Sequence, residues 1–186
     1  MDVTAATFDE DVVARSHERP VVVDFWADWC GPCHALAPVL ERAIDERGDV
    51  ELAKVDVDAN QELAAQFAVR GIPAVKGFRN GRVVAEFTGA RGAATVASFL
   101  DELTQPSEAE RLLDELEERG GLPDVTAAFR SGDHERAFAL LLDEIRAADS
   151  DAREELRRLM VALLAEVGQD DPVATQYRRR LATTLY

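Results

Sequence analysis

Two cysteines three positions apart are the residues of this sequence best suited to chemistry. The 186-residue chain contains only Cys30 and Cys33, in the run CGPC. A single pair at this spacing can cycle between dithiol and disulfide, or it can supply two of the four ligands of a zinc site. Of the three histidines only His34 adjoins the pair. Redox chemistry therefore fits the pair better, and we expect no metal site and no cofactor beyond a redox-active disulfide.

The pair lies where a predicted strand ends and a predicted helix begins. Residues 21–27 read VVVDFWA, a run of β-branched and aromatic residues typical of a buried strand. Apolar residues at helical spacing follow, from Leu36 to Ile44. A helix N-terminus offers free N–H groups and partial positive charge, which stabilise a thiolate. We therefore predict Cys30 as the solvent-facing nucleophile and Cys33 as the shielded thiol that resolves the mixed disulfide.

Three neighbouring residues suit roles in this exchange. Gly31 permits close approach of a substrate, and Pro32 suits the first helical turn, where no N–H is needed. Asp24 is the one acid of the apolar strand. Burial would raise its pKa and make it a candidate proton acceptor for Cys33. A surface position at the strand end is the alternative interpretation of Asp24.

The remainder of residues 1–104 predicts a mixed sheet with helices on both faces. Asn60 is expected to cap a short helix ending at Phe67, and Asn80-Gly81 to form a hairpin turn. Such alternation of strands and helices is typical of an α/β domain. The further expected helices cover residues 8–16 and 91–103, and the further expected strands cover 50–57, 74–78 and 82–87.

The second half of the chain shows no strand pattern. We expect a linker and short helix in residues 105–123 and a small all-α domain in residues 124–186. Two similar stretches begin at Gly132 and Gly168. Their separation is close to the 34-residue period of tetratricopeptide helix pairs, which predicts a short array of such repeats.

Charge and hydropathy exclude several classes of protein. The net charge is −15, and both halves are acidic: residues 1–104 hold 18 acids and 10 bases, and residues 105–186 hold 18 acids and 11 bases. We therefore expect no nucleic-acid partner. No apolar run is long enough to span a membrane, and the N-terminus lacks a signal-peptide pattern. Together with the two cysteines, this predicts a cytoplasmic protein.

Several separated motifs resemble the thioredoxin family. The closest is WADWCGPC at residues 26–33, and the others are VDFW at 23–26, KVDVD at 54–58, GIP at 71–73 and FTGA at 87–90. The resemblance covers residues 1–104. It implies the thioredoxin fold and a protein-disulfide reductase that is recycled by a thioredoxin reductase.

The resemblance also assigns roles to further residues. It implies that Pro73 is cis and packs beside the cysteines, and that Ile72 offers backbone contacts to an extended substrate. Trp29 and Gly89 would belong to the substrate surface. Lys54 would neighbour the buried acid Asp24.

Three positions depart from the family pattern. His34 stands where a lysine is common, Ala74 where a threonine is usual, and Lys76 interrupts a strand that is normally apolar. His34 could perturb the cysteines electrostatically or be a solvated helix residue. Lys76 puts in doubt how deeply its strand face is buried.

The C-terminal segment, residues 171–186, resembles the end of the YbbN-like proteins, or chaperedoxins, which join a thioredoxin domain to tetratricopeptide-like repeats. The resemblance implies client proteins with disulfides or oxidised cysteines, and folding chaperones as partners. We predict a thiol–disulfide oxidoreductase with a co-chaperone tail; the alternative is a non-catalytic holdase. The tail could instead be a stabilising cap or dimerisation element. The run Arg178-Arg179-Arg180 could be a docking patch or a solvated helix face.

Overall fold

The chain folds into two compact units, Met1–Gln105 and Pro106–Tyr186. The structure is a computed structural model that describes residues 1–169 and 171–184. Asp170, Leu185 and Tyr186 lie outside the described residues; the last two end the segment that resembles the chaperedoxins. The described residues hold no helix long and apolar enough to cross a membrane.

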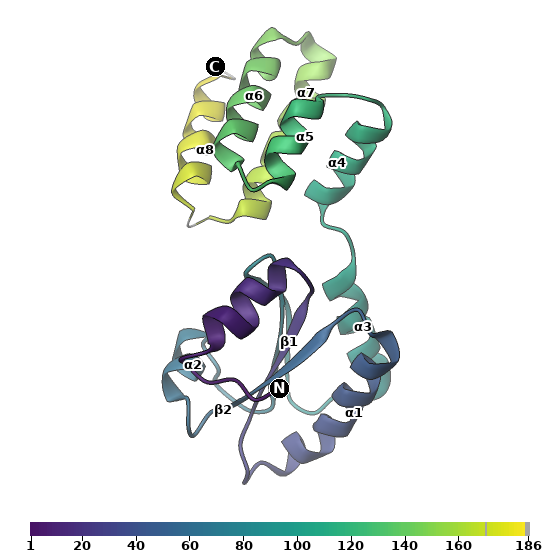
Figure 1. The fold of residues 1–186 in the computed structure, drawn as a ribbon, viewed down its shortest axis with the longest axis vertical. Helices are drawn as coiled ribbons and strands as arrows, with labels where there is room; N and C mark the ends of the chain where they lie inside the picture. The colour runs from purple at the N-terminus through teal and green to yellow at the C-terminus, as the bar shows by residue number, and fades with distance from the viewer. Residues whose placement is uncertain (170, 185–186) are drawn as a thin grey trace. The chain divides into compact units, whose positions relative to one another are not determined.

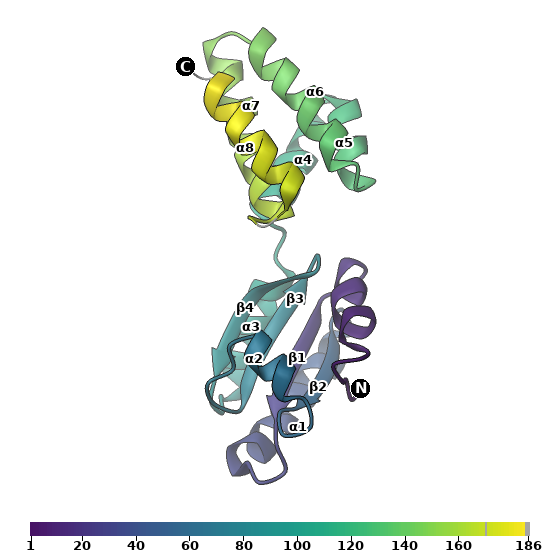
Figure 2. The same cartoon turned by 90° about the vertical axis from the view of Figure 1, so that its left-hand side faces the viewer.

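The first unit is built on a four-stranded mixed sheet in the order β2-β1-β3-β4. Figure 1 labels β1 and β2, and Figure 2 labels all four strands. β1 (Val21–Trp26) pairs parallel with β2 (Glu51–Asp56) and antiparallel with β3 (Ala74–Arg79). β3 and β4 (Arg82–Thr88) form the expected hairpin. Asn80 and Gly81 both have positive φ, 51° and 75°, as a two-residue hairpin turn of this type requires.

Helices cover both faces of this sheet, as predicted (Figure 2). On one face, α1 (Gly31–Arg47) and α3 (Ala93–Thr104) pack on Val22 and Val75. On the other face, the N-terminal segment and α2 (Gln61–Gln66) pack on Val23 and Phe25. The N-terminal segment is a π-helical stretch, η1 (Asp9–Ala14), followed by a 3₁₀ turn, η2 (Arg15–His17), where a helix over residues 8–16 was expected.

Asn60 is the N-cap residue of α2, as expected, but it caps the helix through its backbone alone. Its side chain makes no capping hydrogen bond to that helix. Its Oδ1 accepts a hydrogen bond from Ala5 N–H at 3.0 Å, and its Nδ2 donates to Asp56 O at 3.0 Å. Asn60 is buried, and both of its polar ends are satisfied by tying the N-terminal segment to the loop after β2.

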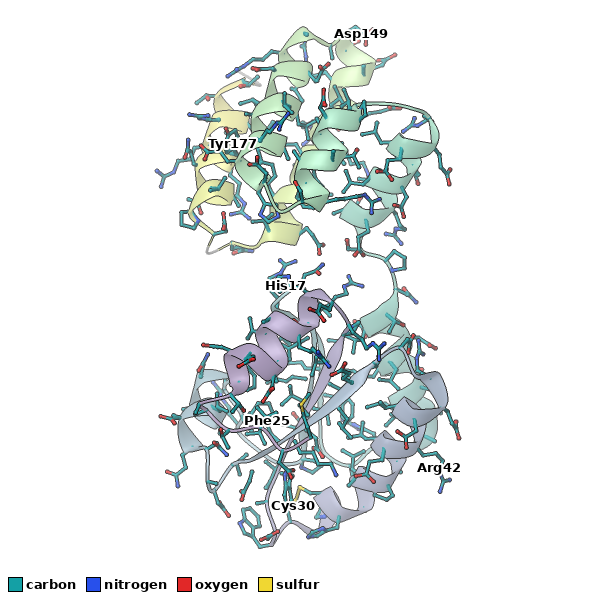
Figure 3. The ribbon with its side chains drawn as sticks, in the orientation of Figure 1. His17, Phe25, Cys30, Arg42, Asp149 and Tyr177 are labelled. Carbon is teal, nitrogen blue, oxygen red and sulfur yellow. A yellow bond between two sulfur atoms is a disulfide. The ribbon has the colours of Figure 1, made fainter. Side chains whose placement is uncertain are left out.

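The site elements meet at one end of the sheet, where β1 ends and α1 begins; Figure 3 labels Cys30 there. Cys30 is the N-cap residue of α1, and proline occupies the first turn of the helix. At the other end of α1, Gly48 adopts a left-handed conformation with φ 71°, and its N–H donates to Ile44 O. Both ends of α1 thus follow ordinary capping rules.

The second unit contains five helices in its described residues and no strand. They are α4 (Glu108–Glu118), α5 (Pro123–Arg130), α6 (His134–Ala147), α7 (Ser150–Val167) and α8 (Pro172–Thr184). Gly132 lies between α5 and α6, and Gly168 between α7 and α8; their φ values are 80° and 108°. Each of the two similar stretches is therefore the turn and second helix of one helix pair, and α5–α6 and α7–α8 are two successive pairs, as the spacing of the glycines predicted.

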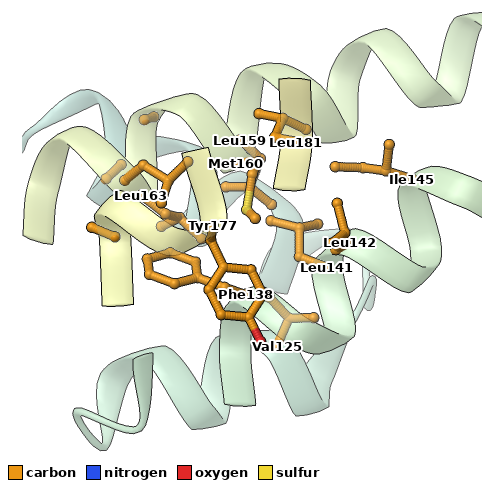
Figure 4. Packing of buried hydrophobic residues seen from close by; sticks show 14 of the residues in the cluster. Val125, Phe138, Leu141, Leu142, Ile145, Leu159, Met160, Leu163, Tyr177 and Leu181 are labelled. Atoms are coloured by element: carbon orange, nitrogen blue, oxygen red, sulfur yellow. The ribbon is translucent and has the colours of Figure 1, made fainter. Parts of the chain in front are cut away.

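The helical unit has one apolar core. Phe138 of α6 and Tyr177 of α8 lie at its centre with ring centroids 5.5 Å apart (Figure 4). Ala109 and Leu113 of α4 join the same core. The short helix expected in residues 105–123 is α4, and it packs with the helix pairs, so the compact unit extends from Pro106.

Candidate active site

Cys30 and Cys33 form a disulfide at the N-terminus of α1, with Cα atoms 5.3 Å apart. The Cys30 Sγ accepts a hydrogen bond from the Cys33 backbone N–H at 3.2 Å. An N–H group of the first helical turn therefore points at the sulfur of the predicted nucleophile. This arrangement favours negative charge on Cys30 once the disulfide is reduced.

The expected difference in exposure between the two cysteines is absent. Cys30 is 3% exposed and Cys33 is 2% exposed. In this disulfide state both pack with Ala27, and the half-buried side chains of Trp26 and Ile72 lie against them. The expectation of a solvent-facing Cys30 was wrong for this state, because the bond to Cys33 draws both residues into one apolar cluster.

Asp24 is a buried acid, not a surface residue at the strand end. It is 2% exposed in the middle of β1, and its Oδ1 accepts no hydrogen bond from the described residues. Burial raises the pKa of Asp24 from 3.8 to about 6, against the opposing effect of the Lys54 charge. A carboxyl group with that pKa can accept and release a proton near neutral pH.

The strand register brings Lys54 to Asp24. The two residues are direct partners in the parallel ladder between β1 and β2. The Lys54 ammonium forms an ion pair with Glu41 of α1. The Glu41 charge acts on Asp24 in the direction opposite to that of Lys54, raising the pKa. Sequence reasoning missed Glu41, which lies outside every motif; only its contact with Lys54 reveals it.

A pocket of about 300 Å³ joins the acid to the disulfide. Asp24, Lys54 and Cys33 line it together with Trp26, Asp28, His34 and Ala37. The volume is enough for several water molecules. A proton can therefore pass between Cys33 and Asp24 through water within this pocket.

His34 is a solvated helix residue held at the edge of this pocket. It is exposed, and its Nε2 lies 2.8 Å from Asp28 O. Lys76, in contrast, is largely buried: its side chain is only 13% exposed and pairs with Glu86 on β4. The strand face is buried there, and the lysine reaches its edge.

The residues that the resemblance assigned to a substrate surface lie around the disulfide. The Ile72–Pro73 peptide bond is cis, and Ile72 packs against the cysteine cluster. Trp29 is 70% exposed, the largest exposed aromatic side chain of the described residues. Its Nε1–H donates to Asp58 Oδ2 at 2.8 Å, so Asp58 fixes the indole; sequence reasoning did not single out this role.

The remaining predicted surface residues are Gly31, Pro32 and Gly89. Gly31 and Pro32 are exposed beside the disulfide at the start of α1. Gly89 has φ 86°, and its N–H donates to Pro73 O at 2.7 Å. Gly89 therefore fixes the backbone of the cis-proline loop.

The arginine run near the C-terminus is not one surface patch. The Arg178 guanidinium donates to Leu164 O and Gly168 O, both at 2.8 Å, and so caps the end of α7. Arg180 stacks over the Tyr177 ring at 4.8 Å. Arg178 and Arg180 thus stabilise the helical unit. Among residues 1–169 and 171–184, no cluster of three or more metal-binding side chains occurs.

The fold and the site define a thiol–disulfide oxidoreductase: a redox disulfide on a helix start, a buried acid beneath it and a cis-proline loop beside it. A sequence model of the thioredoxin family matches residues 1–102. The chain belongs to the thioredoxin family. A tetratricopeptide repeat model matches residues 125–186, so a thioredoxin unit is joined to tetratricopeptide-like repeats.

Several relatives share the thioredoxin part. The thioredoxin of Pseudomonas aeruginosa is 42% identical over 102 residues, which cover 54% of this chain and 93% of that protein. The thioredoxin of Mycobacterium tuberculosis strain H37Rv is 46% identical over 102 residues, covering 54% of this chain and 86% of that protein. The bifunctional thioredoxin reductase/thioredoxin of Mycobacterium leprae is 44% identical over 104 residues, covering 55% of this chain and 22% of that protein.

Proposed function

We propose that this chain reduces disulfides in client proteins and protects their cysteines from further oxidation, while the helical unit holds the client. The observation that carries the chemistry is the Cys30 Sγ at the N-terminus of α1, beside a pocket shared by Cys33 and Asp24. Thioredoxin-type exchange needs these three groups in one place.

In the first step, the Cys30 thiolate attacks one sulfur of the client disulfide. The client S–S bond breaks as a Cys30–client disulfide forms, and one client thiolate leaves. The N–H groups at the start of α1 stabilise the attacking thiolate. Trp29, Gly31 and Pro32 are exposed at this position and would receive the client segment, with Ile72 and Pro73 alongside.

In the second step, Cys33 loses its proton and attacks Cys30 Sγ. The Cys30–Cys33 disulfide forms, the mixed disulfide breaks, and the second client thiolate leaves. Two electrons pass from the dithiol to the client. Asp24 takes the Cys33 proton through the shared pocket; its pKa of about 6 leaves it mainly ionised at neutral pH.

Several wider assignments are part of the same proposal. A thioredoxin reductase returns the disulfide to the dithiol, and the protein acts in the cytoplasm, where a reducing poise keeps that cycle turning. Folding chaperones receive clients from the helical unit. Support for the holding role is the fusion itself, because stacked helix pairs commonly provide protein-binding surfaces.

The test is insulin disulfide reduction at a dithiothreitol concentration too low to act alone. We expect turnover by the wild type, background rates for Cys30→Ser, and a trapped mixed disulfide for Cys33→Ser. Residues 1–105 form a compact unit and should reduce insulin like the full chain but suppress client aggregation less well.

The alternative function is a holdase without catalysis, favoured by the fused helical unit. If wild type and Cys30→Ser suppress aggregation equally and neither reduces insulin, the holdase function takes first place. If residues 1–105 suppress aggregation as well as the full chain, the helical unit is not the client-binding part.

A further inference from the structure

Helix α4 stands apart from the repeat architecture of its own unit. The repeat match begins at residue 125, after α4 ends at Glu118. Yet α4 packs on α7 and also contacts α5, the first helices of the two pairs. The face shared by these two helices is therefore covered by a segment that is not itself a repeat.

The contact between α4 and this face has an apolar centre. Ala109 and Leu113 are buried in the common core, and Leu112 and Leu116 are partly buried against it. Leucines at positions 112, 113 and 116 share one side of a helix, and the opposite side of α4 carries its acids. α4 is thus an amphipathic helix lying on an apolar surface.

Ion pairs at the edges of this contact place acids mainly on α4 and arginines mainly on α5 and α7. Arg130 of α5 reaches Asp114 at 2.6 Å and Glu117 at 3.0 Å. Arg158 of α7 reaches Glu108 at 2.8 Å. One pair runs the other way, from Arg119, the residue that follows α4, to Glu155 of α7 at 3.8 Å. The face under α4 therefore presents arginines chiefly, and its occupant presents acids.

Few interactions stabilise the packing of α4 on the rest of the helical unit. Two residues of α4 are buried, fewer than in any other helix of the unit: α5 and α8 bury three each, and α6 and α7 bury five each. The ion pairs are all solvent-exposed, and such pairs contribute little. A cavity of about 160 Å³ remains between α4 and α7, lined by Leu116, Leu156 and Leu159 among others. Few buried contacts are the mark of segments that open locally at low free energy.

We propose that α4 is the resident occupant of a protein-binding face on α5 and α7, and that an acidic amphipathic helix of a partner protein replaces it. This inference rests on the proposed protein-binding role of the helical unit and names the partner's chemistry. The partner helix carries leucines at the spacing of α4 and acids that meet Arg130 and Arg158. α3 ends at Thr104 and α5 begins at Pro123, so α4 has non-helical segments on both sides and can leave the face without unwinding either neighbour.

Competition between α4 and a partner helix predicts how the affinity for the partner depends on the docking of α4. The affinity for an outside helix is reduced by the fraction of molecules in which α4 is undocked. Changes that loosen α4 must therefore tighten outside binding by the same factor, and a change that fixes α4 must abolish it.

The first experiment measures fluorescence anisotropy of a labelled synthetic peptide with the sequence of residues 106–119, mixed with full-length protein. We expect weak binding to the wild type. Asp114→Asn/Glu117→Gln removes the α4 acids that pair with Arg130 but leaves the core untouched, and should tighten peptide binding by about threefold to tenfold, as expected for the loss of two exposed ion pairs. Arg130→Glu added to Asp114→Asn/Glu117→Gln should remove this gain, because the introduced glutamate repels the acids of the peptide while α4 no longer carries Asp114 and Glu117. A control peptide with the same leucines and its acids replaced by lysine should not bind.

The second experiment fixes α4 in place. Glu108→Cys/Arg158→Cys is made in a Cys30→Ser/Cys33→Ser background and bridged with a short bismaleimide. The bridged protein should lose peptide binding, while the same protein with its two thiols separately capped should keep it; circular dichroism checks that both stay helical.

The inference is overturned if the bridged protein binds the peptide as well as the capped one, or if Asp114→Asn/Glu117→Gln fails to tighten binding. In either case α4 is a permanent part of the core. These results are independent of the proposed thiol chemistry and client holding, which the insulin and aggregation assays test. Normal client holding by the bridged protein would place clients on another surface.

Discussion

The two units of this chain differ in what they bury. The thioredoxin unit holds a carboxylic acid, Asp24, inside its core, with one oxygen that no described residue hydrogen-bonds. In the helical unit, the one polar residue among the buried side chains that the structure describes is Thr126, which donates to Leu122 O. A buried, poorly satisfied acid costs stability, so its presence indicates chemistry. The apolar core of the helical unit indicates that its buried residues serve to stabilise the arrangement of the helices.

The largest expected difference between the two units follows from removal of the Phe138 ring at the centre of the helical core. Phe138 is fully buried and packs on Tyr177. Phe138→Ala should lower the free energy of unfolding of the helical unit by about 3–5 kcal/mol. Urea denaturation followed by circular dichroism measures this loss, and Val161→Ala, at a position that is 48% exposed, is the matched control.

Insulin reduction should be unchanged in Phe138→Ala, because every proposed catalytic and substrate-binding group comes from residues 24–89. A large fall in the reduction rate would show that the chemistry depends on the helical unit, and would remove the distinction between the two.

In the thioredoxin unit, removing the buried charge should stabilise the fold. The folded pKa of Asp24 is raised above 3.8 to about 6. The stability that this group contributes is complete below pH 3.8 and is lost as the pH rises through 6. A pKa rise of this size corresponds to about 3 kcal/mol. Asp24→Asn should therefore raise the free energy of unfolding by up to about 3 kcal/mol at pH 8.

The same substitution should slow disulfide reduction, because Cys33 loses its proton acceptor. Denaturation at pH 4 and pH 8 checks the sign: the gain should be small at pH 4 and large at pH 8. Equal gains at both pH values would mean that Asp24 has an ordinary pKa in the folded protein.

Local sequence predicted the thioredoxin unit well because each of its signals is physical and short-ranged. Asn80-Gly81 has the positive φ values of a hairpin turn, and Cys30 begins a helix. What could not be predicted depends on tertiary contact. Glu41 reaches Lys54 only because α1 packs beside β2, and the Asn60 side chain accepts from Ala5 N–H at 3.0 Å instead of from the N–H groups of α2.

The helical unit was predicted less completely for the same reason. Gly132 and Gly168 mark the turns between helices, so the two pairs could be found from spacing. The place of α4 could not, because an amphipathic helix does not specify which surface it covers. Likewise, the arginine run gives no sign that Arg178 caps α7.

A smaller effect on stability is expected from adding a methyl group to a glycine of the sheet. Gly77 of β3 lies under α3: an added Cβ would come within 2.9 Å of Leu103 Cδ1 and 3.2 Å of Phe99 Cζ. Gly77→Ala should cost about 1–3 kcal/mol through overpacking. Gly92→Ala is the control, since nothing lies within 4 Å of its added Cβ. Urea midpoints that shift equally for the two variants would contradict this account of Gly77.

The smallest and most specific prediction concerns the two charges around Asp24. Lys54 lowers the pKa of Asp24 and Glu41 raises it, although the two side chains pair with each other. Glu41→Gln should therefore lower the Asp24 pKa, and Lys54→Met should raise it. The measurement is an NMR titration of the Asp24 carboxyl carbon in the oxidised protein, where neither cysteine titrates.

The kinetic consequence follows the same signs. If Asp24 accepts the Cys33 proton, the acid limb of the rate of insulin reduction moves to lower pH in Glu41→Gln and to higher pH in Lys54→Met. A purely structural role for the Glu41–Lys54 pair would lower stability in both variants without moving the two titrations in opposite directions. Shifts of the same sign would mean that the pair acts on Asp24 by positioning it, and not through charge.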